Sequence, residues 1–273
     1  MQTSLEIQNI TKSYTRNIKP ANGKSDIERS ALLYDLSLEL EAGKITALIG
    51  GNGTGKTTLF NIISGFIKPD SGKVLFQNQH FINLTKIKAY KIPHLGIGRM
   101  FQDDHIFPDL SIIDNMLIAD QDEFGIKPWQ ALFNRKQIDL AEKKKENKAF
   151  QIFENIFGSN NDFWNNRHKL AVNLSHGEKK LLGLCRLFMN DYEIILLDEP
   201  TSGVNENLFS KIKEILQNFK QRGSTVFLIE HNLSFVKQVA DFCAFLNNGR
   251  IEKVGKTQEI FKDELVQKNY LGI

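Results

Sequence analysis

A glycine-rich segment containing one lysine, GGNGTGKTT at residues 50–58, constrains this chain more than any other feature. Apolar runs precede it at residues 45–49 and follow it at residues 59–63, so we expect a buried strand, a loop and a helix. The spacing fits GxxxxGK[ST], a pattern in which backbone N–H groups surround a phosphate chain. A plain glycine turn between a strand and a helix is the alternative, but such a turn needs neither the lysine nor the two threonines.

The residue types within this segment suit phosphate binding. Glycines allow the backbone to approach an anion that a Cβ atom would push away. Lys56 can reach the β- and γ-phosphates of a nucleotide, and the Thr57 hydroxyl can coordinate Mg²⁺. The predicted phosphate-loop residues are Gly50, Gly51, Asn52, Gly53, Thr54, Gly55, Lys56, Thr57 and Thr58.

Composition limits the other functional classes. At 273 residues and 41% hydrophobic content, the chain can form one large α/β domain or two small ones. A net charge of +3 is too small to indicate nucleic-acid binding. The two cysteines, Cys185 and Cys243, lie in apolar stretches and are expected to be buried. No apolar run reaches the length of a membrane span and the N-terminus does not resemble a signal peptide, so we expect a cytoplasmic protein.

The pattern along the chain predicts an α/β fold with three parts. Residues 3–10 and 36–40 alternate as two antiparallel strands, and residues 16–30 between them read as an exposed hairpin loop or insertion. Residues 85–93 look helical, and residues 103–172 are expected to contain amphipathic helices at 112–119 and 136–157. Later, buried strands at 194–197 and 225–229 flank a helix at 207–222, which predicts a parallel sheet.

Three polar residues follow predicted strands, where chemistry collects in parallel sheets. They are Gln102, Asp198 and His231. Asp198 comes after four apolar residues and fits an acid that holds Mg²⁺ through water. Glu199 could accept the proton of an attacking water. A polar turn after a strand is the alternative interpretation of Asp198 and Glu199.

Taken in order, these motifs resemble the ATP-binding subunit of ABC transporters along nearly the whole chain. The phosphate loop is similar to the Walker A loop, LSHGE at 174–178 to the ABC signature, and IILLDEP at 194–200 to the Walker B strand with its catalytic glutamate. Gln102 resembles the Q-loop glutamine, and His231 the switch histidine. Tyr14 occupies the place of the aromatic residue that stacks on adenine, although the spacing from Tyr14 to Gly50 is longer than usual.

The resemblance implies specific roles and ligands. ATP and Mg²⁺ would be the ligands, Glu199, His231 and Gln102 the catalytic residues, and Thr57, Gln102 and Asp198 the magnesium-binding residues. Ser175, Gly177 and Glu178 would contact ATP held by the other protomer of a head-to-tail dimer. Two departures stand out: His176 replaces the more frequent glycine of the signature, and Asn205 stands where an aspartate is usual.

The resemblance also implies a domain organisation: one P-loop NTPase core with a mainly parallel sheet, an antiparallel β-subdomain and an inserted α-helical subdomain. We expect one ATP-binding domain over residues 1–273. Residues 1–102 and 190–273 would form the catalytic core with the β-subdomain, residues 103–173 the helical subdomain, and residues 174–178 the signature.

Finer details resemble the ATPases of branched-chain amino acid and urea importers. These details are GIGRMFQ at 96–102, GVN at 203–205 and YLG at 270–272. The implied partners are membrane permease subunits, a second ATPase chain in a homodimer or heterodimer, and a solute-binding protein, with the chain on the inner face of the plasma membrane. The loop at 103–110 lies where this family docks its permease. A lipopolysaccharide or lipid exporter ATPase, a soluble non-transport ABC ATPase and a regulatory subunit that binds ATP without hydrolysing it are the alternatives.

Overall fold

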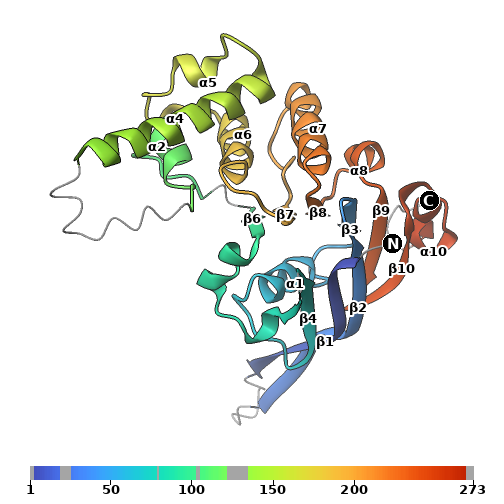
Figure 1. Cartoon of the computed structure of the whole chain (residues 1–273). Helices are drawn as coiled ribbons and strands as arrows, with labels where there is room; N and C mark the ends of the chain where they lie inside the picture. Colours follow the sequence, from blue (N-terminus) through green and yellow to red (C-terminus); the bar gives the residue numbers. More distant parts are fainter. Residues whose placement is uncertain (1–2, 19–25, 79, 103–104, 122–134, 269–273) are drawn as a thin grey trace. The chain divides into compact units, whose positions relative to one another are not determined.

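The computed structural model describes residues 3–18, 26–78, 80–102, 105–121 and 135–268. The chain divides into two compact units, each described here by itself (Figure 1). The first unit comprises Met1–Ile97, Glu193–Glu199 and Phe219–Ile273. The second comprises Gly98–Tyr192 and Pro200–Asn218. The finer division proposed from the sequence, with boundaries near residues 102 and 173, stays a prediction.

An antiparallel sheet with strand order β2-β1-β4-β5 belongs to the first unit. β1 (Thr3–Ile18) pairs antiparallel with β2 (Asp26–Glu41), as the alternating patterns predicted. β4 (Ser71–Gln77) and the short β5 (Phe81–Asn83) complete it. Within the predicted 16–30 insertion, residues 16–18 and 26–30 are paired strand residues that lengthen the β1–β2 hairpin. Residues 19–25 lie outside the described residues.

A second sheet has the order β10-β9-β3-β8-β7-β6. Its centre is parallel, because β3 (Ile45–Ile49) pairs in parallel with β8 (Thr225–Ile229) and β9 (Phe242–Asn247), and β8 with β7 (Ile194–Asp198). Every residue of β3, β7 and β8 is buried, as expected for strands covered on both faces. β6 spans Ile97–Met100 and β10 spans Arg250–Lys256.

The helices of the first unit are short. α1 (Lys56–Ile63) follows β3 and packs Phe60 against Phe227 of β8, with ring centroids 5.0 Å apart. α8 (Leu233–Val239), α9 (Thr257–Ile260) and α10 (Glu264–Val266) follow β8 or β10. α1 therefore follows, after the loop at residues 50–55, a strand at the centre of the parallel sheet.

The helix expected at residues 85–93 was wrong. The segment forms three single 3₁₀ turns: η1 (Leu84–Lys86), η2 (Ala89–Lys91) and η3 (Pro93–Leu95). Pro93 lacks an N–H and fixes its own φ, so it can begin η3 but cannot continue an α-helix. Leu84 and Ile92 are buried within the first unit's apolar core, which explains the apolar spacing.

The second unit is mainly helical. The helices expected at 112–119 and 136–157 are confirmed as α2 (Ile112–Leu117) and α4 (Arg135–Phe157). α5 (Asp162–Asn165) and η4 (Ala171–Asn173) precede α6 (His176–Leu187), and α7 (Glu206–Gln221) begins after β7. Cys185 in α6 is buried and free, as is Cys243 in the first unit. Burial raises the pKa of both thiols.

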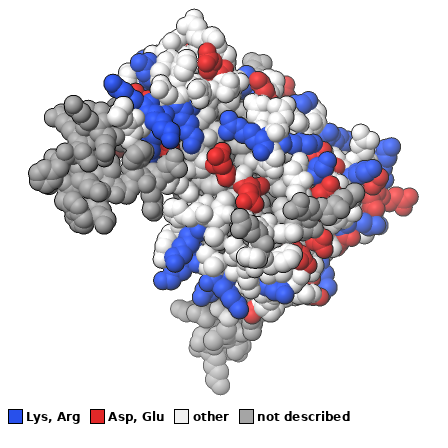
Figure 2. Space-filling view, in the orientation of Figure 1, with Lys and Arg blue, Asp and Glu red and all other residues white. Residues whose placement is uncertain are grey.

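Both basic (Lys or Arg) and acidic (Asp or Glu) side chains occur on the face drawn in Figure 2, so neither sign of charge covers it alone. This mixture agrees with the small net charge of the chain. Among the residues that the structure describes, no helix combines the length and apolar character needed to cross a membrane.

Candidate nucleotide-binding and catalytic site

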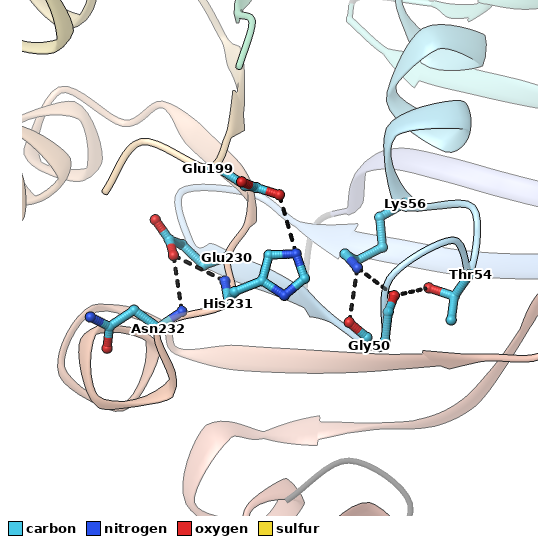
Figure 3. A network of polar contacts seen from close by, with 8 residues as sticks. Gly50, Thr54, Lys56, Glu199, Glu230, His231 and Asn232 are labelled. Carbon is cyan, nitrogen blue, oxygen red and sulfur yellow. Dashed lines mark hydrogen bonds and ion pairs between the residues drawn. The ribbon is translucent and has the colours of Figure 1, made fainter. Parts of the chain in front are cut away.

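The phosphate loop joins β3 to α1 and is closed by its own lysine. The Lys56 Nζ atom donates hydrogen bonds to the carbonyl oxygens of Gly50 and Gly51, both at 2.8 Å, and Thr54 Oγ1 donates to Gly51 at 2.9 Å (Figure 3). Gly55 caps α1 with φ of +105°, and a Cβ atom there would lie 2.5 Å from Leu33 Cδ2. The loop thus has its lysine at the first position of the helix, as the sequence pattern requires.

Lys56 is a buried cation beside two acids. Its side chain is 6% exposed, and burial lowers its pKa below the ordinary 10.5. The negative charges of Glu199 and Asp198 act in the opposite direction and raise that pKa. The site therefore places one positive and two negative groups within electrostatic reach of each other in the first unit.

The two acids sit at the carboxyl end of β7. Asp198 is the last residue of that strand and is 2% exposed. Glu199 has a left-handed φ of +52°, and its N–H donates to the Ile229 carbonyl of the neighbouring strand at 2.9 Å. A residue other than glycine in this conformation costs free energy and is often found at functional sites. This backbone turns the Glu199 carboxylate toward His231 (Figure 3).

His231 is held in place by a neighbour that sequence reasoning missed. Its Nε2 atom lies 3.1 Å from Glu199 Oε1. Glu230, only 2% exposed, accepts hydrogen bonds through Oε2 from the N–H groups of His231 (3.0 Å) and Asn232 (3.2 Å). Asn232 in turn caps α8 by accepting from Phe235 at 3.0 Å. Glu230 comes directly after the apolar strand TVFLI, and this position is the signal that could have identified it.

The predicted signature residues form the first turn of α6 in the second unit. Ser175 caps the helix: its Oγ accepts from the Glu178 N–H at 3.3 Å, and Glu178 Oε2 accepts from the Ser175 N–H at 2.8 Å. Gly177 lies between them. This reciprocal capping box fixes the start of the helix, and a helix N-terminus favours an anion. The nearby His176 ring contacts the segment after β7.

Gln102, also in the second unit, is tied to α6 through its backbone. Its carbonyl accepts a hydrogen bond from Lys180 Nζ at 2.7 Å, and Lys180 is 1% exposed. Sequence reasoning did not identify Lys180. Two consecutive lysines near the start of a helix normally indicate a solvent-exposed face. The catalytic and magnesium-binding roles assigned to Gln102 stay predictions.

Tyr14 lies in β1 opposite Ser30 of β2 and is 43% exposed. The Lys12 ammonium is 5.6 Å from the centroid of its ring. Lys12 is paired with Leu33, the residue that packs against Gly55. Tyr14 is therefore two residues along β1 from a strand pair that touches the phosphate loop. Its stacking on adenine stays a prediction.

A family profile described as ABC transporter matches residues 33–202, which is more than half of the chain. The chain belongs to this family. The probable branched-chain amino acid transport ATP-binding protein LivG of Archaeoglobus fulgidus is 33% identical over 240 residues, covering 88% of this chain and 89% of the relative. The high-affinity branched-chain amino acid transport ATP-binding protein LivG of Escherichia coli strain K12 is 29% identical, covering 87% and 91%.

A solved ATP-binding cassette of an ABC transporter, in its ADP conformation, has the same fold as this ABC ATPase. It covers 100% of both chains with a TM-score of 0.76 and 28% identity. The α/β cassette fold predicted from the ordered motifs is confirmed. As an ABC transporter ATPase, the chain binds nucleotide, and proteins of this family work with membrane permease subunits.

Proposed function

We propose that this ABC ATPase powers the import of branched-chain amino acids, or of a similar small polar solute, through separate membrane permease subunits. The observation that carries this proposal is the similarity to LivG proteins over nearly nine tenths of the chain. The short matches at residues 96–102 and 203–205 point to the same subfamily. A lipid exporter ATPase and a soluble non-transport ABC ATPase are the competing assignments.

Hydrolysis would be carried out by the acids and the histidine of the first unit. Glu199 would act as the general base that accepts the proton of the attacking water. His231, 3.1 Å from Glu199, would stabilise the γ-phosphate and this water. Lys56 would contact the β- and γ-phosphates. Its hydrogen bonds to two loop carbonyl oxygens hold the ammonium group within the loop.

The donor set around the phosphate loop fits Mg²⁺. Thr57 offers a hydroxyl in the first turn of α1, and Asp198 a buried carboxylate at the end of β7. Magnesium in nucleotide sites is held by one or two carboxylates together with phosphates, not by an all-protein cage. Gln102 would complete the set.

The signature would act in trans. Ser175, Gly177 and Glu178 stand at a capped helix start, which suits a phosphate brought by a second chain. The proposed dimer, with itself or with a paralogue, would then hold two ATP molecules between head-to-tail chains. Its place would be the cytoplasmic face of the plasma membrane, beside the permease and a solute-binding protein.

One loop of the second unit holds the backbone of an exposed aromatic residue in place. Asn115, fully buried, accepts from the Phe107 N–H and donates to the Phe107 carbonyl, each at 2.9 Å. The Arg186 guanidinium donates to the His105 carbonyl at 2.7 Å. The Phe107 side chain remains 45% exposed, and we propose residues 105–110 as the permease contact. Residues 103 and 104, the start of the expected docking loop, lie outside the described residues.

The test is affinity purification of the tagged ATPase from detergent-solubilised native membranes, with mass spectrometry of co-purifying chains and a parallel ATPase assay. Two multi-span permease subunits together with a solute-binding protein would support import, and radiolabelled leucine uptake should then depend on the chain. Recovery of a lipid-export permease would favour the exporter. Soluble partners alone, with ATPase activity intact, would overturn the transporter assignment.

A further inference from the structure

We propose that His176 is a positioning residue that locks the signature loop onto the turn after the Walker B acids. The signature loop is defined here as residues 175–178, and the following turn as residues 202–205. Both belong to the second unit. The inference rests on the proposed function of the signature, because it assigns His176 an effect on hydrolysis that passes through Ser175 and Glu178.

The first observation is a polar contact across the two segments. His176 Nε2 lies 3.3 Å from the Ser202 carbonyl oxygen, and the tautomer with hydrogen on Nε2 donates this bond. His176 is separated from Ser202 by 26 positions in the sequence. The contact therefore joins two segments that are distant in the sequence.

The second observation is that Gly203 is shaped to receive the His176 ring. A Cβ atom at this position would lie 2.7 Å from His176 Nε2 and 2.8 Å from Cδ2, closer than real Cβ contacts allow. Gly203 also has a left-handed φ of +70°, which favours glycine. The ring of His176 thus fills the space that a side chain at residue 203 would need.

A second close contact joins the signature loop to α7, the helix that follows the turn. A Cβ atom on Gly177 in the signature loop would lie 2.5 Å from Leu208 Cδ1 in the first turn of α7 and 3.9 Å from Val204 Cγ1. The His176 ring therefore packs against Gly203, and the Leu208 side chain packs against Gly177. A shift of either segment would change both contacts.

This lock has a consequence for catalysis. Ser202 follows Glu199 by three residues, so the turn lies close to the proposed catalytic acid in the sequence. Through His176, the turn then holds Ser175 and Glu178 in the position where they would meet the second protomer's nucleotide. Removing the lock should lower kcat and the cooperativity of hydrolysis in ATP, while ATP binding at Lys56 keeps its affinity.

The test combines four variants in the full chain: His176→Gly, which removes ring and hydrogen bond; His176→Gln, which keeps an N–H donor; Gly203→Ala; and the His176→Gly/Gly203→Ala double variant. Gly158→Ala is the matched control, because Gly158 also has a left-handed φ (+83°) but nothing within 4 Å of a Cβ atom. Each variant is measured for kcat, KM, Hill coefficient and ATP affinity.

We expect His176→Gly to lower kcat about tenfold, the effect of one hydrogen bond and its packing. ATP affinity should change less than about twofold, since the Lys56 loop is untouched. His176→Gln should recover part of the loss. Gly203→Ala should lower kcat more than Gly158→Ala, and its effect should shrink in the His176→Gly background, because the clash with the ring is gone.

Unchanged kcat and Hill coefficient in His176→Gly, or an equal effect of Gly203→Ala in both backgrounds, would overturn the inference. The parallel Glu199→Gln variant separates this outcome from a failure of the proposed function. If Glu199→Gln abolishes hydrolysis while His176→Gly is normal, only the positioning role fails. If Glu199→Gln retains normal hydrolysis, the proposed catalytic site itself is wrong.

Discussion

The Nε2 atom of His231 lies 3.1 Å from Oε1 of Glu199, although 32 residues separate them in the chain. Sheet register accounts for this meeting: Asp198 of β7 pairs with Ile229 of β8, and the Glu199 N–H continues the ladder to the Ile229 carbonyl. Each side chain then emerges just beyond the carboxyl end of its strand. Parallel neighbouring strands therefore bring a carboxylate and an imidazole together at the edge where the phosphate loop also begins.

Glu199→Gln should separate nucleotide binding from hydrolysis. The amide keeps the size of the side chain but cannot accept a proton, so turnover should fall by about 10² to 10⁴, the usual effect of losing a general base. ATP affinity should be retained. Phosphate release and an ATP titration measure the two quantities, with Glu146→Gln on the exposed surface of α4 as the control. Near-normal turnover would remove Glu199 from the mechanism.

Glu230 should matter through His231. Glu230→Ala removes the acceptor of two part-buried N–H groups, and the loss of a hydrogen bond typically costs about 0.5–1.5 kcal/mol of unfolding free energy. Glu230→Gln retains one acceptor oxygen and should lose less. Urea unfolding gives the stability difference, and ATPase assays should show a lower kcat in the alanine variant. Equal stability of all three proteins would show that these hydrogen bonds contribute nothing measurable.

Most of the cassette could be predicted because its signals are local. The apolar runs of β3, β7 and β8, the amphipathic pattern of α4 and the glycine loop each depend on neighbouring residues in sequence. The segment at residues 85–93 shows where such signals fail: its apolar spacing resembled a helix, but Pro93 and the burial of Ile92 gave 3₁₀ turns. β9, which is parallel to β3, and β10, which is antiparallel to β9, were not predicted.

The candidate site was predictable wherever a motif names the residue, as for Lys56 or Glu199. Residues that act across long sequence separations were not. Lys180 bonds a carbonyl 78 positions away, and the His176 ring packs on Gly203. Neither relationship has a sequence pattern, because each depends on how the second unit folds.

Lys56 should make stability depend on pH. Burial holds its pKa below 10.5, so between that lowered pKa and 10.5 the folded protein binds fewer protons than the unfolded chain. The free energy of unfolding should therefore rise with pH across this window. Lys56→Met should abolish that rise, as measured by urea unfolding of the nucleotide-free protein at about pH 8 and about pH 10. Lys144→Met, on an exposed part of α4, should leave it unchanged.

Lys56→Ala should also lose nucleotide affinity, because it removes the charge that meets the phosphates. The ATP dissociation constant, measured by calorimetric titration, should rise steeply relative to wild type. Lys253→Ala removes a lysine of the same unit that is paired with Asp263 instead of lying in the loop, and it provides the control. ATP binding of wild-type strength in Lys56→Ala would refute the assigned role.

Phe107→Ala should weaken the permease contact and spare the ATPase fold. The side chain is 45% exposed, while Asn115 holds only the backbone of this residue, so truncation should leave the loop in place. We expect less permease in the affinity purification at unchanged thermal stability. Leu140→Ala, at another exposed apolar residue of the unit, is the comparison. Unchanged permease recovery would exclude Phe107 from the interface.

Asn205→Asp should be almost neutral, although aspartate is the residue expected at this position in the family. In this chain Asn205 Oδ1 accepts from the Leu208 N–H at 3.3 Å and so caps α7. Asparagine and aspartate cap helices about equally well, whereas Asn205→Ala should cost about 1 kcal/mol of unfolding free energy. Urea unfolding tests the cap, and the Hill coefficient tests coupling between protomers. A changed Hill coefficient in Asn205→Asp at unchanged stability would show that the missing charge matters for coupling, because the cap is the same in both.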